Sequence, residues 1–192
     1  RTYAEQGDED QAEAIWQHLH QTHPDSLKVD IAKADILRRK SGPDSCIDYL
    51  SGLWTKHKDS IAPLEYLTQI CTQEDRHEEC IAILEDAVNT IENVQDYKEA
   101  VMLLSRIYAD AQDDHAYYIL EDLYGKYPQD REVLQELITS AYQFGRTDAI
   151  QKAVDALKKI EGQDGWQWKY EQARLWFHSE NFERNYPQIV SL

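Results

Sequence analysis

The sequence predicts an all-α protein built from repeated pairs of antiparallel helices. The first supporting observation is composition: the 192 residues include only 7 Gly and 5 Pro, while 42% are hydrophobic and 29% are charged. This composition is typical of a helical globular protein and excludes the collagen-like and low-complexity classes. The second observation is an internal repeat with a period of about 34 residues, which indicates stacked supersecondary units.

The repeat is present in both polar and apolar residues. The segments His23–Ser26 and His57–Ser60 lie 34 residues apart, and the small residues Ala12, Cys46 and Cys80 recur at the same interval. Large apolar residues follow at constant spacing: Trp16, Leu50 and Leu84, then Leu19, Leu53 and Ala87. Two later copies, displaced by two residues, contain Ala116, Leu120 and Leu123, then Ile150, Val154 and Leu157. The spacing i, i+4, i+7 places each set on one face of an amphipathic helix.

A further helix is predicted before each of these amphipathic helices, so each repeat has a first and a second helix. The predicted first helices span residues 27–39, 61–73, 97–110, 131–144 and 166–178. The helix boundaries carry turn and start signals: Gly7 and Gly145 at inner turns, Pro24 and Pro128 in connections, and Asp96 with Glu99 as an N-cap pair. Pro187 lies near the start of the last helix, where proline is tolerated in the first turn and disruptive later.

This pattern resembles the tetratricopeptide repeat (TPR) family. The matching residues are Gly7, Ala12, Trp16, Leu19 and Pro24 in one copy, and Ala111, Ala116, Leu120, Leu123 and Pro128 in another. The resemblance covers essentially the whole chain. It implies a right-handed superhelical solenoid of about 5.5 repeats of 34–36 residues, with the first helices lining a concave groove and the second helices outside.

We therefore expect residues 1–192 to form a single repeat array with partial first and last repeats. The chain begins at Arg1 rather than methionine and ends within a predicted helix. The array is accordingly expected to be a fragment of a longer chain.

Charge and motif content exclude several functional classes. The 20 Lys+Arg against 36 Asp+Glu give a net charge of −16, which repels phosphate backbones and argues against nucleic-acid binding. No apolar run approaches the roughly 18 residues that a membrane span needs. The sequence contains no GxGxxG, P-loop, GxSxG or HExxH motif, so we expect neither an enzyme nor a bound cofactor or metal.

The three cysteines lack the spacing of a zinc site and are too few for a disulfide framework. A reducing compartment, and hence the cytoplasm, is the default expectation. Cys71 and Cys80 flank an inner turn, where a disulfide switch is one interpretation. The other is that cysteine packs as a small hydrophobic residue, since Cys46 and Cys80 occupy an alanine position of the repeat.

One polar cluster has the residue types of a metal or catalytic site. Asp113, Asp114 and His115 are consecutive and lie at a predicted inner turn between helices. That position indicates a solvated turn.

The candidate binding residues lie late in successive first helices. At equivalent places in the repeat stand Ala4, Arg38, Thr72, Tyr108, Tyr142 and Phe177. Tyr108, Tyr142 and Phe177 would form an aromatic ladder in the groove, suited to an extended peptide or an inserted helix. The alternative is that these rings only pack between adjacent helices.

A basic patch is predicted at the other end of the groove. Arg38 and Arg39, with Lys28 nearby, could pair with a carboxylate of a partner. Alternatively, Asp30 and Asp35 neutralise these cations within the chain.

The function predicted from these observations is a non-catalytic scaffold that binds a protein or peptide partner in its groove. A basic or aromatic-rich partner would suit the acidic chain. The TPR clamp for a chaperone's terminal carboxylate is not expected, because no asparagine lies on the groove face of a first helix. Two alternatives remain: a recognition segment of a larger enzyme or polysaccharide export complex, since aromatic rings also stack on sugars, and self-assembly through the array ends.

Overall fold

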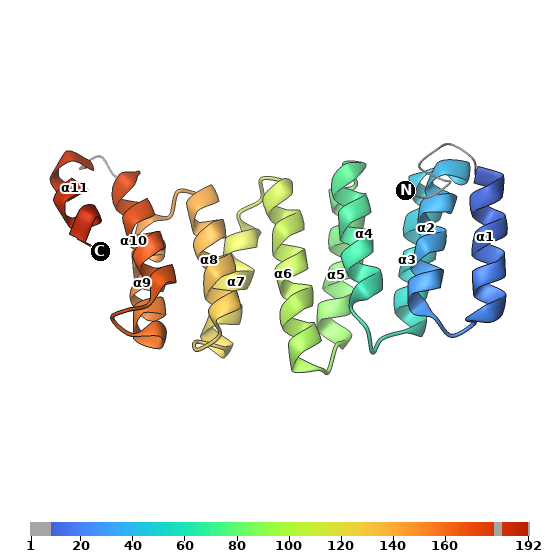
Figure 1. Ribbon diagram of the computed structural model, residues 1–192, viewed down its shortest axis with the longest axis horizontal. Helices are drawn as coiled ribbons and strands as arrows, with labels where there is room; N and C mark the ends of the chain where they lie inside the picture. Colours follow the sequence, from blue (N-terminus) through green and yellow to red (C-terminus); the bar gives the residue numbers. More distant parts are fainter. Residues whose placement is uncertain (1–8, 179–181, 192) are drawn as a thin grey trace. The chain divides into compact units, whose positions relative to one another are not determined.

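The structure, a computed structural model, describes residues 9–178 and 182–191. In this part of the chain eleven helices follow one another and no strand is formed, so the predicted all-α fold is confirmed (Figure 1). The chain divides into two compact units, residues 1–110 and 111–192. None of the described helices is both long enough and apolar enough to cross a membrane.

Helices α1 to α6 belong to the first unit and α7 to α11 to the second. Their bounds are α1 Glu9–Thr22, α2 Leu27–Ser41, α3 Pro43–Lys56, α4 Ala62–Gln73, α5 His77–Thr90, α6 Val94–Asp110, α7 His115–Lys126, α8 Arg131–Gln143, α9 Thr147–Glu161, α10 Trp166–Phe177 and α11 Phe182–Ser191. The even-numbered helices are the predicted first helices of the repeat, and the odd-numbered ones are the second helices.

In the first unit each helix packs against the next one along the chain, and α4 also contacts α6. The predicted apolar faces of α3 and α5 form the core together with residues of the first helices. Side chains with essentially no exposed surface include Cys46, Leu50, Leu64, Leu67, Leu84 and Ile107. Burial of each leucine or isoleucine contributes about 1.5–3 kcal/mol, so the i, i+4 pattern is the main source of packing energy.

The second unit has the same arrangement, with α7 on α8, α8 on α9, α9 on α10 and α10 on α11. All six residues that the repeat predicts to be apolar here are buried: Ala116, Leu120, Leu123, Ile150, Val154 and Leu157. The repeat spacing therefore identified the core positions of α3, α5, α7 and α9. It is wrong for Leu19 on α1, which is 41% exposed, because α1 packs mainly against α2 and only Ala12 of its predicted stripe is buried.

Helix α6 begins earlier than predicted, at Val94 rather than residue 97. The side-chain oxygen of Asn93 accepts the backbone N–H groups of Gln95 at 2.8 Å and Asp96 at 3.1 Å. Asn93 thus caps the helix, and Asp96 lies inside the first turn, where its charge favours the helix dipole. The predicted N-cap at Asp96 is therefore wrong.

Pro187 lies in the interior of α11, which continues to Ser191. The proline therefore does not end the helix. It removes the backbone donor to the carbonyl of Glu183, and because Glu183 is exposed, water can bind that carbonyl instead. Gly7 and Ala4 lie outside the described residues.

Two inner turns use the same backbone motif. Asp75 after α4 and Gly145 after α8 have φ angles of 57° and 64°. The next residue donates its N–H back into the helix, Arg76 to the Cys71 carbonyl at 2.9 Å and Arg146 to the Ala141 carbonyl at 2.8 Å. This is the Schellman pattern of helix termination, which requires a left-handed residue.

We expect Gly145→Ala to lower the free energy of unfolding by about 1–2 kcal/mol through backbone strain alone. A methyl group at Gly145 would meet no other atom within 4 Å, so no steric clash contributes. Gly52→Ala in exposed, open space on α3 is the matched control and should stabilise the protein by about 0.5–1 kcal/mol. Denaturant unfolding followed by circular dichroism tests both, and equal effects of the two substitutions would contradict the analysis.

Candidate functional site

The predicted basic patch lies on α2, and its two arginines differ in setting. Arg38 Nη1 lies 3.0 Å from Glu74 Oε1 and donates to Gln73 Oε1 at 3.3 Å, while Arg38 Nη2 is 3.6 Å from Asp35 Oδ1. Arg39 is exposed. The charge of Arg38 is therefore balanced within the first unit, and Arg39 presents its charge to solvent.

Tyr108 on α6 also contacts a neighbouring helix of the first unit, α5. The ring is half-buried, and its hydroxyl donates to Glu85 Oε1 at 2.7 Å. At the equivalent place on α4, Thr72 donates to Asp110 Oδ2 at 2.9 Å. Both side chains bridge to a neighbouring helix.

Tyr142 is packed between α8 and α10 of the second unit. The Arg174 guanidinium lies 3.9 Å from the ring centre, and the hydroxyl donates to the Glu171 carbonyl at 3.3 Å. Burial raises the pKa of Tyr142 to about 12. Phe177, in contrast, is 61% exposed and contacts the ring of His178 edge-on at 5.4 Å.

Three of these positions share one structural role. Arg38, Thr72 and Tyr142 each bond to the next first helix along the chain. These contacts agree with the interpretation that residues at this position of the repeat pack between adjacent helices. Tyr108 lies in the first unit and Tyr142 and Phe177 in the second, so the aromatic ladder as a ligand site stays a prediction.

A cavity of about 150 Å³ lies between α8, α9 and α10. It is lined by Arg131, Gln135, Ile138, Leu157, Trp166, Gln167, Tyr170 and Glu171. Trp166 and Tyr170 are 69% and 59% exposed, unusually high for large aromatic rings. The sequence analysis did not single out this site.

A signal for these rings is nevertheless present in the sequence. Trp166 and Tyr170 are four residues apart, and Phe177 follows eleven residues after Trp166, so at about 100° per residue all three share one helix face. Trp168 and Leu175, which are buried, lie on another. The core packing of α10 uses the face of Trp168 and Leu175, so it does not account for the three aromatic residues on the other face.

The turn before α10 fixes the position of this face. A methyl group at Gly165 would lie 2.3 Å from Glu161 Cβ and 2.6 Å from Glu161 Oε2, so only glycine fits. Glu161 Oε2 accepts the Trp168 N–H at 3.0 Å, and the Trp168 indole donates to the Gly162 carbonyl at 2.9 Å. The close approach therefore lets a glutamate from α9 cap α10.

A polar wall closes one side of the cavity. The Arg131 guanidinium donates to Glu161 Oε1 and, at 2.6 Å, to Gln167 Oε1. The Gln167 amide donates in turn to Gln135 Oε1 at 3.5 Å. The Glu161 side chain is only 4% exposed, so its charge and that of Arg131 form a tightly paired unit.

Glu171 is the buried charge of the cavity. The residue is 8% exposed, and its Oε2 has no hydrogen-bond partner, although Arg174 Nη1 lies 3.5 Å away. Burial raises the pKa of Glu171 above its usual value, an effect that Arg174 opposes. The ionised carboxylate is thus buried with one oxygen that receives no hydrogen bond, which is unfavourable.

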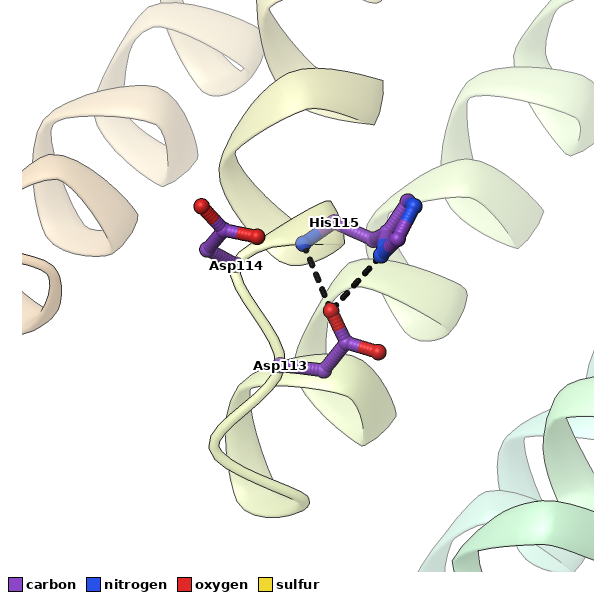
Figure 2. Close-up of side chains that lie close together, drawn as sticks. All are labelled: Asp113, Asp114 and His115. Atoms are coloured by element: carbon purple, nitrogen blue, oxygen red, sulfur yellow. Dashed lines mark hydrogen bonds and ion pairs between the residues drawn. The ribbon is translucent and has the colours of Figure 1, made fainter.

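Asp113, Asp114 and His115 lie close enough to hold a cation, and Figure 2 shows their arrangement. Asp113 Oδ1 accepts the backbone N–H of His115 at 3.0 Å and lies 2.7 Å from His115 Nδ1. These bonds lower the pKa of Asp113. Asp114 Oδ2 accepts from Arg146 at 2.8 Å. Both carboxylates therefore already serve the start of α7 and its contact with α9.

The three cysteines are free and fully buried. A hydrogen bond to Cys71 and burial raise the pKa of Cys80, and burial raises the pKa of Cys46 to about 11. Both effects suppress the reactive thiolate. The environment accords with cysteine as a small packing residue.

We expect Glu171→Gln to stabilise the protein above neutral pH, since the substitution removes a buried, incompletely satisfied charge. Because the folded-state pKa is raised, the unfavourable ionisation is absent well below 4.5 and increases as the pH rises. The stability difference from the parent protein should shrink towards zero in acid. The exposed Glu132→Gln is the control, with an effect within about 0.5 kcal/mol at every pH. Urea unfolding across the pH range would refute this if Glu171→Gln destabilised equally throughout.

Gly165→Ala should destabilise the second unit by about 1–3 kcal/mol, because the methyl group must displace the capping carboxylate of Glu161. Gly125→Ala, where a methyl group meets no atom within 4 Å, should not destabilise. Thermal unfolding monitored by tryptophan fluorescence measures both. Equal melting temperatures for the two variants would show that the close approach is unimportant.

No family model matches the sequence, and no curated protein matches it. Several solved structures share the fold. A structure of pilF from Pseudomonas aeruginosa superimposes with a TM-score of 0.57 at 14% identity, covering 98% of this chain and 83% of that one. Two structures of MamA give TM-scores of 0.51 and 0.50 at 17% and 18% identity, covering 83% and 88% of this chain and 89% and 93% of theirs. PilF and MamA are TPR proteins, and at these identities the similarity establishes a TPR-like fold for this chain.

Proposed function

We propose that the protein is a non-catalytic scaffold that binds a segment of another protein on the surface of its first helices. The observation that carries this proposal is the cavity beside α10. There the exposed rings of Trp166 and Tyr170 lie beside the side-chain amides of Gln135 and Gln167. Rigid aromatic rings supply contact area at low cost in conformational entropy. The amides of Gln135 and Gln167 can hydrogen-bond to a peptide backbone.

The size and chemistry of the cavity favour a side chain of a larger partner. Its volume of about 150 Å³ is below the roughly 300–1,000 Å³ typical of small-molecule sites. The lining residues include no serine or cysteine beside a histidine, the pairing that activates the commonest nucleophiles. The TPR-like fold adds to this support, because such folds present a long surface made of successive helices.

The residues predicted from the sequence take two roles in this proposal. Arg39 and Phe177 are exposed and can contact a partner, whereas Arg38, Tyr108 and Tyr142 mainly hold helices in position. The most informative variants therefore change exposed rings. Removing Tyr142 would disturb the packing of α8 on α10.

A second candidate function is recognition of a saccharide as part of a larger assembly. The specific observation in its favour is that the exposed indole of Trp166 and phenol of Tyr170 flank one cavity, an arrangement that could also stack on a sugar ring. Binding to a glycan array, with no binding to peptides, would support this function instead.

To test the scaffold function, a displayed library of random twelve-residue peptides is selected on the 192-residue chain. Selected peptides should bind the parent protein, and their affinity should fall at least about tenfold for the double variant Trp166→Ala, Tyr170→Ala, a typical loss for aromatic contact residues. Both rings are largely exposed, so the fold should be retained, which circular dichroism verifies.

The matched control is Tyr186→Ala, Val190→Ala on α11, which removes two side chains that are 56% and 71% exposed and lie outside the cavity. Its peptide affinity should equal that of the parent. If the library yields no binding peptide, the scaffold proposal is wrong. If both double variants bind equally well, recognition does not use the cavity.

A further inference from the structure

The cavity combines an apolar floor with a buried anionic group. Ile138 and Leu157, 1% and 2% exposed, form the floor, and the rings of Trp166 and Tyr170 form the sides. Glu171 adds a carboxylate whose Oε2 is buried without a hydrogen-bond partner. A ligand suited to this site has an apolar body and a donor at its end.

The cations near the cavity are already engaged. Arg131 is bonded to the buried carboxylate of Glu161 and to Gln167. Arg174 is stacked on Tyr142 with its guanidinium 3.9 Å from the ring centre, and its closest approach to Glu171 Oε2 is 3.5 Å, without hydrogen-bond geometry. Glu171 therefore has an ion-pair partner in Arg174, but its Oε2 receives no hydrogen bond and can still accept one.

We propose that this cavity binds an arginine or lysine side chain projecting from a basic segment of a partner protein. The proposal rests on the scaffold function and specifies the chemistry of its partner. The methylene stem would pack on Ile138 and Leu157, as the stems of long cationic side chains do on apolar surfaces. The cationic head would lie against Trp166 and Tyr170 and donate to Glu171 Oε2.

Two features favour a cation over other side chains. A purely apolar side chain would leave the Glu171 oxygen unsatisfied, and an acidic one would face the same carboxylate. The net charge of −16 also attracts basic segments. Because the terminal torsion of a glutamate side chain is broad, the carboxylate can rotate its free oxygen towards the bound cation. Arginine should bind more tightly than lysine, since its planar guanidinium also stacks on aromatic rings.

The test uses three capped tripeptides of the form acetyl-Gly-X-Gly-amide, with X arginine, its neutral isostere citrulline, or glutamate. Binding to the full 192-residue chain is followed by NMR through the indole N–H signal of Trp166. The arginine peptide should bind saturably with a Kd of about 1 mM, as expected for a single side chain. The citrulline peptide should bind about tenfold more weakly, and the glutamate peptide should not bind.

Variants separate the contributions to this binding. Glu171→Gln should weaken arginine-peptide binding about tenfold, to the level of citrulline. Glu132→Gln removes the same charge from an exposed site outside the cavity lining and should leave affinity unchanged. Trp166→Ala, at a largely exposed position where the fold should tolerate it, should also weaken binding, which is then read from other signals of α10.

Equal affinities for the arginine and citrulline peptides, or an unchanged affinity in Glu171→Gln, would overturn the proposal. Its failure is distinguishable from that of the scaffold function. Selected library peptides that require Trp166 and Tyr170 but are not enriched in arginine or lysine would support the scaffold and refute the cation site. Specific binding of the arginine tripeptide without any selected library peptide would support the cation site and refute the scaffold.

Discussion

The structure depends on the fact that a helix of this length cannot bury its apolar face alone. Each described helix has 10 to 17 residues, close to the length at which isolated helices are marginal in water. Stability must therefore come from the neighbouring helices, which bury the i, i+4, i+7 stripe of α3, α5, α7 and α9. The fully buried Leu50, Leu84, Leu120 and Val154 show the same solution repeated at equivalent positions. Packing between neighbours is thus both the source of stability and the reason for the repeat.

Polar contacts add geometric precision to this packing. In each unit an arginine that follows a left-handed turn residue reaches back to an aspartate near the start of an earlier second helix: Arg76 to Asp44 in the first unit and Arg146 to Asp114 in the second. Exposed ion pairs of this kind contribute little to stability, with a typical value below about 1 kcal/mol. The same contact is nevertheless repeated at equivalent turns of the two units.

The cavity beside α10 follows from a local departure from the repeat. Gly165 permits an approach to Glu161 that no larger residue could make, and the Glu161 carboxylate then caps α10 while it holds Arg131. This arrangement fixes Trp166 and Tyr170 at the edge of the cavity. It also leaves Glu171 buried with an unsatisfied oxygen, an unfavourable state that a bound donor would relieve. The proposed binding of a basic segment thus has the same structural origin as the cavity.

Much of this protein could be predicted from its sequence, because helix formation and core burial depend on local periodicity. The 34-residue spacing identified the helix pairs, most of their bounds and most of the buried positions, but not the exposure of Leu19 on α1. Asn93 as the cap of α6 was missed, since capping depends on which side-chain oxygen meets the N–H groups of the first turn. The candidate site was harder to predict. The repeat spacing showed that Arg38, Thr72 and Tyr142 occupy equivalent positions. Their hydrogen bonds to the next first helix could not be predicted, because they depend on how the helices pack. The cavity itself was decided by tertiary structure. Helical spacing places Trp166 and Tyr170 on a face apart from the buried Trp168 and Leu175. The cavity, however, requires residues of three helices to meet, and the burial of Glu171 depends on the path of the chain at Gly165, which no local pattern encodes.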